Sequence, residues 1–147
     1  MRLFQCSAAT ARGTLVLGWF TSFLAGLAML LYLYLFDWIA QDNFKYALSQ
    51  LSALYAPYLG AMLAFYFGTR NKTGHAARAS GAAFALASTG SLIWNLGVLI
   101  LIVRVVLLWG HIEPAVKDMT FLGSTLSWLV APAMGFYFAN PIDKASP

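Results

Sequence analysis

Residues 14–36 read TLVLGWFTSFLAGLAMLLYLYLF, a stretch without a single charged side chain. A helix needs roughly 20 apolar residues to cross the hydrocarbon core of a bilayer, and this stretch is long enough. It is also longer than the apolar region of a cleaved signal peptide, which has roughly 7 to 15 residues. We therefore expect residues 14–36 to form an uncleaved transmembrane helix.

Three more apolar stretches predict further spans at about residues 47–67, 80–110 and 119–139. The whole chain of 147 residues is 61% hydrophobic and only 10% charged, which is unlike an ordinary soluble domain. The sequence predicts an all-α fold, an integral membrane four-helix bundle in which residues 1–147 form a single transmembrane domain. The third stretch would make about 46 Å of helix against a core of about 30 Å, so it must tilt or extend into the cytoplasm.

The distribution of charge predicts the orientation in the membrane. Lysine and arginine gather at the N-terminus and between the second and third spans, and such residues favour the cytoplasmic side. Four of the five acidic residues lie in the other two connections. We expect both termini on the cytoplasmic side of a bacterial inner membrane. The basic residues on which this prediction depends are Arg2, Arg12, Arg70, Lys72 and Arg78.

A ten-residue pattern occurs twice in the chain. Residues 51–60 read LSALYAPYLG and residues 126–135 read LSWLVAPAMG, so both contain L-S-x-L-x-A-P-x-x-G. Each copy is followed by Phe-Tyr-Phe, which comes one helical turn later in the first copy. The recurrence predicts two duplicated parallel helical hairpins. Chance similarity between two apolar helices is the alternative.

Small residues recur at every fourth position of the predicted spans. Such a stripe lets helix backbones approach closely in a membrane, where lipid supplies no hydrophobic drive for association. The stripes serve either packing within one bundle or packing between subunits, and their presence on every span favours an oligomer. The main packing candidates are Gly18, Ser22, Gly26, Ala56, Gly60, Ala64, Ala131 and Gly135.

Two prolines, Pro57 and Pro132, lie inside predicted spans. A proline in a helix has no N–H and leaves the carbonyl four residues earlier without its donor, so we expect a bend at each. The freed carbonyls belong to Ala53 and Trp128. They can line an aqueous path in a channel, and a simple structural bend is the alternative.

The third span carries three polar candidates for a pore or vestibule, Ser91, Asn95 and Arg104. Asn95 lies near the middle of the span, and Arg104 is the one charge within the apolar run. A charge at the bilayer centre costs at least ~2.5 kcal/mol and requires water, a partner or a route to the interface. Arg104 can extend along the helix to the interface, face a water-filled vestibule, or pair with Glu113, Asp118 or Asp37.

The sequence contains no pattern that predicts catalysis, a metal or a cofactor. Cys6 is the only cysteine, and the predicted topology places His75 and His111 on opposite sides of the membrane. The chain lacks the arginine, asparagine and glutamate pattern of the four-helix glutathione-using transferases. It also lacks the first-span glutamate of the small multidrug transporters. We expect no enzymatic activity and no direct binding of nucleic acid.

The stretch from Leu51 to Gly68, with its ending FYFGTR at residues 65–70, resembles helices of small multi-span membrane effectors in bacterial anti-phage defence systems. The resemblance is confined to this stretch. It implies an oligomeric channel or pore that disturbs the host membrane and is gated by a partner or a nucleotide signal. The expected partners are therefore the lipid bilayer, further copies of the chain and a cytoplasmic regulatory protein.

The sequence thus favours a homo-oligomeric channel or pore-forming effector of the bacterial inner membrane. Two alternatives stay open. A small solute transporter would use Asn95 as a binding residue at the middle of the membrane. An assembly subunit of a larger membrane complex would use the small-residue stripes for packing against other proteins.

Overall fold

The computed structural model describes residues 8–68, 81–108 and 111–138 of the chain. Over these ranges it contains helices and no strand, which confirms the predicted all-α class. The helices are α1 (Ala8–Leu35), α2 (Gln41–Gly68), α3 (Gly81–Leu108), α4 (Ile112–Thr125) and α5 (Ser127–Phe138). Cys6, His75 and the basic residues 2, 70, 72 and 78, on which much of the predicted orientation depends, lie outside the described residues.

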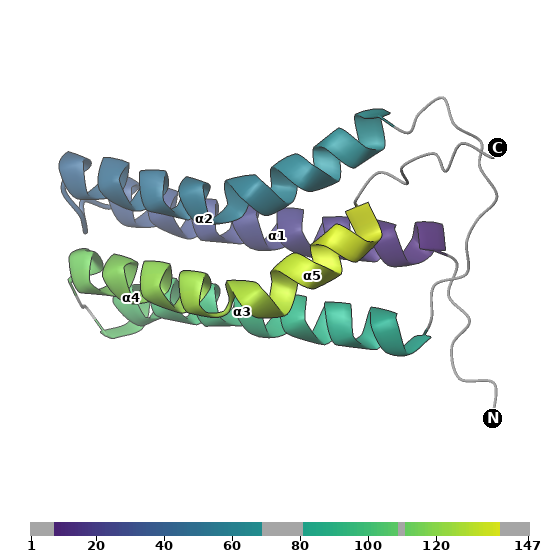
Figure 1. Ribbon diagram of the computed structural model, residues 1–147. Coiled ribbons are helices and arrows are strands. Elements are labelled where there is room, and N and C mark those ends of the chain that lie inside the picture. The colour runs from purple at the N-terminus through teal and green to yellow at the C-terminus, as the bar shows by residue number, and fades with distance from the viewer. Residues whose placement is uncertain (1–7, 69–80, 109–110, 139–147) are drawn as a thin grey trace, which may run out of the picture.

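The helices α1, α2 and α3 and the α4–α5 pair lie side by side along one direction (Figure 1). Helix α1 packs against α2 and α3, and both α4 and α5 pack against α2 and α3. Helices α1 and α3 run in one direction, and α2, α4 and α5 run in the opposite direction. The core between them is made of apolar side chains from all five helices.

Two helices are long and apolar enough to cross a membrane: α1 over Thr10–Leu35 and α3 over Phe84–Leu107. The α4–α5 pair is a third candidate if the bent pair counts as one span. Helix α2, which covers the predicted span 47–67, is not among the candidates in the described part of the chain. Its first turns carry Gln41, Asp42 and Lys45, so only its later part is apolar.

The fourth helical region begins earlier than the predicted residue 119. Helix α4 starts at Ile112, so residues 112–118 are helical and do not form a connection. Pro114 lies within the first turn, where a missing N–H costs nothing because the first N–H groups of a helix have no internal partner. Lys117 Nζ donates to Glu113 Oε1 at 2.8 Å, an i,i+4 pair that supports the helix.

The connection between α1 and α2 is a tight helix end. Asp37 adopts a left-handed backbone with φ of 57°. The N–H of Asp37 donates to the Tyr34 carbonyl at 3.1 Å, and the N–H of Trp38 donates to the Leu33 carbonyl at 2.9 Å. This double hydrogen bond is the Schellman motif, which satisfies the last carbonyls of a helix and reverses the chain.

The second expected bend lies at a different residue from the one predicted. Helices α4 and α5 meet at 54° across Leu126, whereas Pro132 lies six residues later, inside α5. Helix α2 also bends along its length (Figure 1), and Pro57 lies within it. The break at Leu126 has its own hydrogen bonds: Leu126 N–H donates to Leu122 O at 2.9 Å, and Leu129 N–H donates to Leu126 O at 3.0 Å.

The two copies of the ten-residue pattern are buried in the same way. When residues 52–62 are aligned with residues 127–137, each pair of equivalent positions is alike in being buried, half-buried or exposed. Tyr55 and Val130, for example, are equivalent and both completely buried. The pattern therefore places the same side of each helix against the core.

Candidate functional site

Aromatic rings fill the centre of the helical assembly. The rings of Trp19 and Trp94 lie with centroids 4.8 Å apart at 31°. Tyr55 makes edge contacts with both, at 5.6 Å and 5.0 Å, and Tyr58 packs on Trp19 at 4.6 Å. Trp19, Tyr55 and Trp94 are completely buried. The middle of a single copy is thus occupied by side chains and not by an aqueous path.

Ser91 and Asn95 lie on the buried side of α3, next to this cluster in the sequence. Asn95 Nδ2 donates to the Ser91 carbonyl at 2.7 Å. Asn95 Oδ1, Ser91 Oγ and Trp19 Nε1 are buried and have no hydrogen-bond partner within the described residues. Each unsatisfied buried group costs about 1–3 kcal/mol. The interior of the helical assembly therefore holds buried polar groups that have no partner in the described part of the chain.

Trp19 and Trp94 are not among the residues predicted from the sequence, although a signal for them existed. The step along the chain from Trp19 to Trp94 is the same as the step from Leu51 to Leu126 in the repeated pattern. Trp94 Nε1 donates to the Gly123 carbonyl at 2.9 Å, whereas Trp19 Nε1 has no acceptor in the described part of the chain. The repeat therefore extends beyond the ten-residue pattern and includes this pair of tryptophans.

Arg104 lies on the opposite side of α3 from Asn95. The two are nine residues apart, which is about two and a half helical turns and hence about half a turn of rotation. Arg104 Nη1 lies 3.7 Å from Asp118 Oδ2, and the two side chains are 60% and 58% exposed. Of the three expected partners of Arg104, Asp118 is the one that forms an ion pair with it among the described residues. It does not bring Arg104 together with Ser91 and Asn95.

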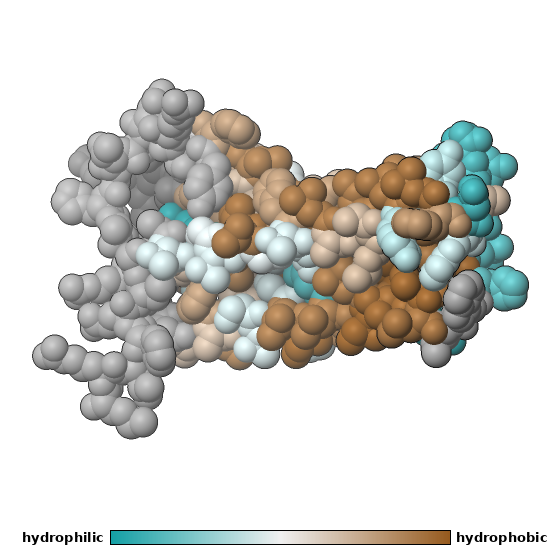
Figure 2. Space-filling view, turned by 180° about the vertical axis from the view of Figure 1, so that it is seen from behind, coloured by the Kyte–Doolittle hydropathy of each residue, from teal (hydrophilic) through white to brown (hydrophobic). Residues whose placement is uncertain are grey.

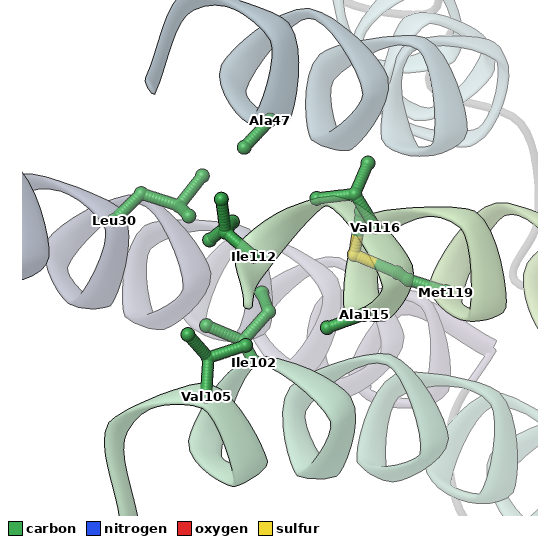
Figure 3. A pocket seen from close by; sticks show the side chains of 8 residues that line it. All are labelled: Leu30, Ala47, Ile102, Val105, Ile112, Ala115, Val116 and Met119. Carbon is green, nitrogen blue, oxygen red and sulfur yellow. The ribbon is translucent and has the colours of Figure 1, made fainter. Parts of the chain in front are cut away.

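A hollow of about 270 Å³ lies beside this ion pair, between α3 and α4. Its lining includes Arg104, His111 and Pro114. A second cavity, between α1, α2, α3 and α4, is lined only by apolar side chains such as Leu30 and Met119 (Figure 3). Its volume of about 10 Å³ is close to that of one water-sized sphere. A cavity this small with no polar lining stays dry, whereas the hollow at Arg104 has charged and polar side chains that can contact ions.

The structural role of Arg12 was also not predicted, because in the sequence it contributes only a positive charge to the predicted orientation. Arg12 Nε donates to the Tyr137 carbonyl at 2.9 Å, in the last turn of α5. Its guanidinium also lies 4.5 Å from the centroid of the Phe65 ring. The last carbonyls of a helix have no partner within the helix, and a cation is favourable there. Arg12 thus joins the start of α1 to the ends of α2 and α5.

The small-residue candidates divide into two groups. Ser22 and Gly26 are buried, and a Cβ added at Gly26 would lie 3.3 Å from Leu51, so these residues serve packing within one copy. The others are exposed, and a Cβ added at any of the three exposed glycines would meet no atom within 4 Å. The exposed candidates are Gly18, Ala56, Gly60, Ala64, Ala131 and Gly135.

The outside of the molecule is strongly apolar. Figure 2 shows a broad zone of apolar side chains beside an end that is polar. All five helices contribute large exposed apolar side chains, among them Leu17, Phe67, Ile100, Phe121 and Trp128. Such a surface suits contact with lipid or with other protein chains.

Comparison of the chain with protein-family models, curated proteins and solved structures finds no match.

Proposed function

We propose that the chain is the subunit of a homo-oligomeric membrane channel or pore, with its aqueous path between subunits. The filled aromatic centre supports this arrangement, because four packed helices of this size leave no room for a path within one copy. The exposed apolar surface supports contact with lipid and with neighbouring copies. In this proposal the chain acts in a bacterial inner membrane and carries no enzymatic activity.

The proposed topology has four spans, α1, α2, α3 and the α4–α5 pair, arranged as two duplicated parallel hairpins. The matching burial of residues 52–62 and 127–137 supports the duplication, as does the same spacing of Trp19 and Trp94. Both termini and residues 69–80 would face the cytoplasm. An impermeant thiol reagent tests this: with Cys6 replaced by serine, Asn43→Cys should react in intact cells and Thr73→Cys should resist. The opposite pattern would refute the topology.

The ion pair of Arg104 and Asp118 is the observation that carries the channel proposal. A charged pair beside a hollow of about 270 Å³ suits the mouth of an ion path. Arg104 attracts anions and repels cations, and Asp118 does the reverse. The ion selectivity of a narrow path near both residues would therefore change when either charge is removed.

Current recordings on the purified protein in planar bilayers test the proposal. Arg104→Leu should move the reversal potential towards cation selectivity, because it also leaves Asp118 unpaired. Asp118→Asn should move it towards anions, and Arg104→Lys should change it little. Lys117→Gln is the matched control, since it removes one positive charge from a side chain that is similarly exposed. Equal shifts of the reversal potential for Arg104→Leu and Lys117→Gln would show that Arg104 acts only as a general surface charge.

In the effector form of this proposal a cytoplasmic regulatory protein or signal opens the pore. The similarity of residues 51–70 to anti-phage effector helices is its support. Expression of the chain in bacteria, alone and with candidate regulators, tests it through a dye that reports membrane potential. Depolarisation only with a regulator would support gating, and no depolarisation under any condition would remove the effector role.

A small solute carrier is the second candidate, and the unused polar atoms of Ser91 and Asn95 favour it. A solute at the middle of the membrane would supply the missing hydrogen bonds. Asn95→Leu should then abolish solute uptake into vesicles, whereas the channel proposal predicts unchanged conductance for this variant. An assembly subunit of a larger complex is a third candidate, which copurification with other membrane proteins would support.

A further inference from the structure

Helices α2 and α5 each present an exposed face at matching positions of the repeat. The α2 face consists of Ala53, Ala56, Pro57, Gly60 and Ala61, all of them exposed. The α5 face consists of the equivalent residues of the second copy, which are also all exposed: Trp128, Ala131, Pro132, Gly135 and Phe136.

The two faces differ in shape at two positions. Ala53 and Ala61 of the α2 face correspond to Trp128 and Phe136 of the α5 face, which are 68% and 67% exposed. The two aromatic side chains are eight residues apart, or about 12 Å along a helix. The α5 face therefore carries two large projections where the α2 face is flat. A flat face made of small residues accepts such projections, whereas two α5 faces would hold each other apart.

The two faces also match in hydrogen-bonding groups. Trp128 is exposed and carries an indole N–H for which the described residues provide no acceptor. Pro57 has no N–H, so the Ala53 carbonyl lacks its usual helical donor. In lipid both groups would gain from a partner, because no water is present to satisfy them. The α5 face thus offers a donor where the α2 face offers an acceptor.

The donor and the acceptor lie at corresponding heights along the bundle. Trp19 and Trp94, which are equivalent in the repeat, lie against each other with ring centroids 4.8 Å apart, so α1 and α3 are in register. Phe65 of α2 and Phe138 of α5, which lie close to equivalent positions, also make a ring contact at 5.7 Å. Copies in a membrane share one orientation, and rotation about the membrane normal preserves height. Ala53 of one copy can therefore face Trp128 of the next.

We propose that copies of the chain associate head to tail, with the α5 face of one copy against the α2 face of the next and the Trp128 indole N–H donating to the Ala53 carbonyl across the interface. This inference rests on the proposed homo-oligomer and names the surfaces that build it. Contacts between two different faces form rings when the rotation closes, and the membrane plane excludes a helical rise. The ring encloses the path that a single copy lacks.

Cysteine cross-linking in membranes tests the arrangement in a Cys6→Ser background. The variant with both Gly60→Cys and Gly135→Cys should form a ladder of covalent multimers that stops at one ring size. Each single variant should stay uncrosslinked. The pair Gly18→Cys and Gly135→Cys is the matched control, because Gly18 is equally open but lies on α1; it should form no ladder.

The outcomes separate this inference from the proposed function. Efficient dimers from either single variant would mean that like faces meet, which overturns the head-to-tail interface and leaves an oligomer. An oligomeric mass in detergent without cross-links in the double variant would place the interface elsewhere and also overturn it. A monomer by mass would remove the proposed function together with the inference.

Substitution of Trp128 tests the hydrogen bond separately. Trp128→Phe keeps the projection and loses the N–H, so it should weaken association about three- to tenfold, as expected for one hydrogen bond in a membrane. Trp128→Ala loses the projection as well and should weaken association further. Phe121→Ala, which removes an exposed aromatic side chain from α4, is the control and should have no effect. Equal association of Trp128→Phe and the parent would remove the hydrogen bond from the proposal.

Discussion

The two copies of the repeated pattern lie in helices of different continuity. In the first copy α2 runs unbroken from Gln41 to Gly68, whereas in the second the chain breaks at Leu126 into α4 and α5. The hydrogen bonding of two buried tryptophans also differs between the copies. Trp94 donates to the Gly123 carbonyl just before the break, and Trp19, its counterpart, has no acceptor among the described residues.

This difference links the break at Leu126 to the hydrogen bond of the Trp94 indole. A helix that continued past Leu126 would use the Gly123 carbonyl for the N–H of Ser127. Because the helix ends at Thr125, this carbonyl is free to accept the Trp94 indole N–H. In the unbroken α2 the counterpart of Gly123 is Leu48, whose carbonyl is used by the N–H of Ser52, so it cannot serve Trp19 in the same way. The helix break thus supplies an acceptor for Trp94, whereas Trp19 has no acceptor in the described part of the chain.

The largest effect is expected from Gly123→Val. A Cβ at this position would lie 2.8 Å from Leu54 Cδ2 and 3.4 Å from Trp94 Cζ2, so Leu54 and the buried Trp94 ring must shift to admit the valine side chain. We expect a loss of about 3 kcal/mol in the free energy of unfolding, from overpacking and the disturbed hydrogen bond. Denaturant titration in detergent micelles measures it. Gly18→Ala, whose Cβ would meet no atom within 4 Å, is the control and should cause no loss of stability, because alanine favours a helix more than glycine does.

A paired substitution compares the two tryptophans directly. Trp94→Phe leaves the Gly123 carbonyl buried without its donor, whereas Trp19→Phe removes an N–H that has no partner among the described residues. Loss of ring volume is common to both. Trp94→Phe should therefore cost about 1–2 kcal/mol more than Trp19→Phe in the same titration. Equal costs would show that the hydrogen bond does not stabilise the break.

Arg12 offers a smaller effect that involves both copies, because it contacts Phe65 of α2 and the Tyr137 carbonyl of α5. Arg12→Lys keeps the charge and loses the planar donor group. We expect a loss of about 1 kcal/mol, from a weaker hydrogen bond and a weaker contact with the ring. Arg12→Gln should lose somewhat more, and stability unchanged in both would show that Arg12 does not hold the helix ends together.

The smallest effect is expected from Pro132→Ala. The bend of 54° lies at Leu126, six residues before this proline, and has its own hydrogen bonds. The angle between α4 and α5 should therefore stay the same, whereas Pro57→Ala should straighten α2. Distances between spin labels placed on the two halves of each helical region measure both. If the α4–α5 region became straight in Pro132→Ala, the proline would be the cause of the bend.

The sequence was sufficient to predict helices, apolar surfaces and the repeated pattern, because each of these follows from local periodicity and composition. It also identified Asp118 as one of three partners for Arg104. It could not reveal the start of α4, since Glu113 and Lys117 read as a polar connection until their i,i+4 pairing in a helix is known. Nor could it show which side of α3 faces the core, so that Asn95 is buried and Arg104 is exposed.

The all-helical class and the apolar helices can be predicted from the amino-acid sequence alone, because they depend on the composition and spacing of neighbouring residues. Which small residues face the core and which face outward depends on how the helices pack together. Ser22 and Gly26 pack inside, whereas Gly60 and Gly135 are exposed. The reason is physical: a stripe of small residues has the same appearance in either place, and only the positions of the neighbouring helices determine what it contacts.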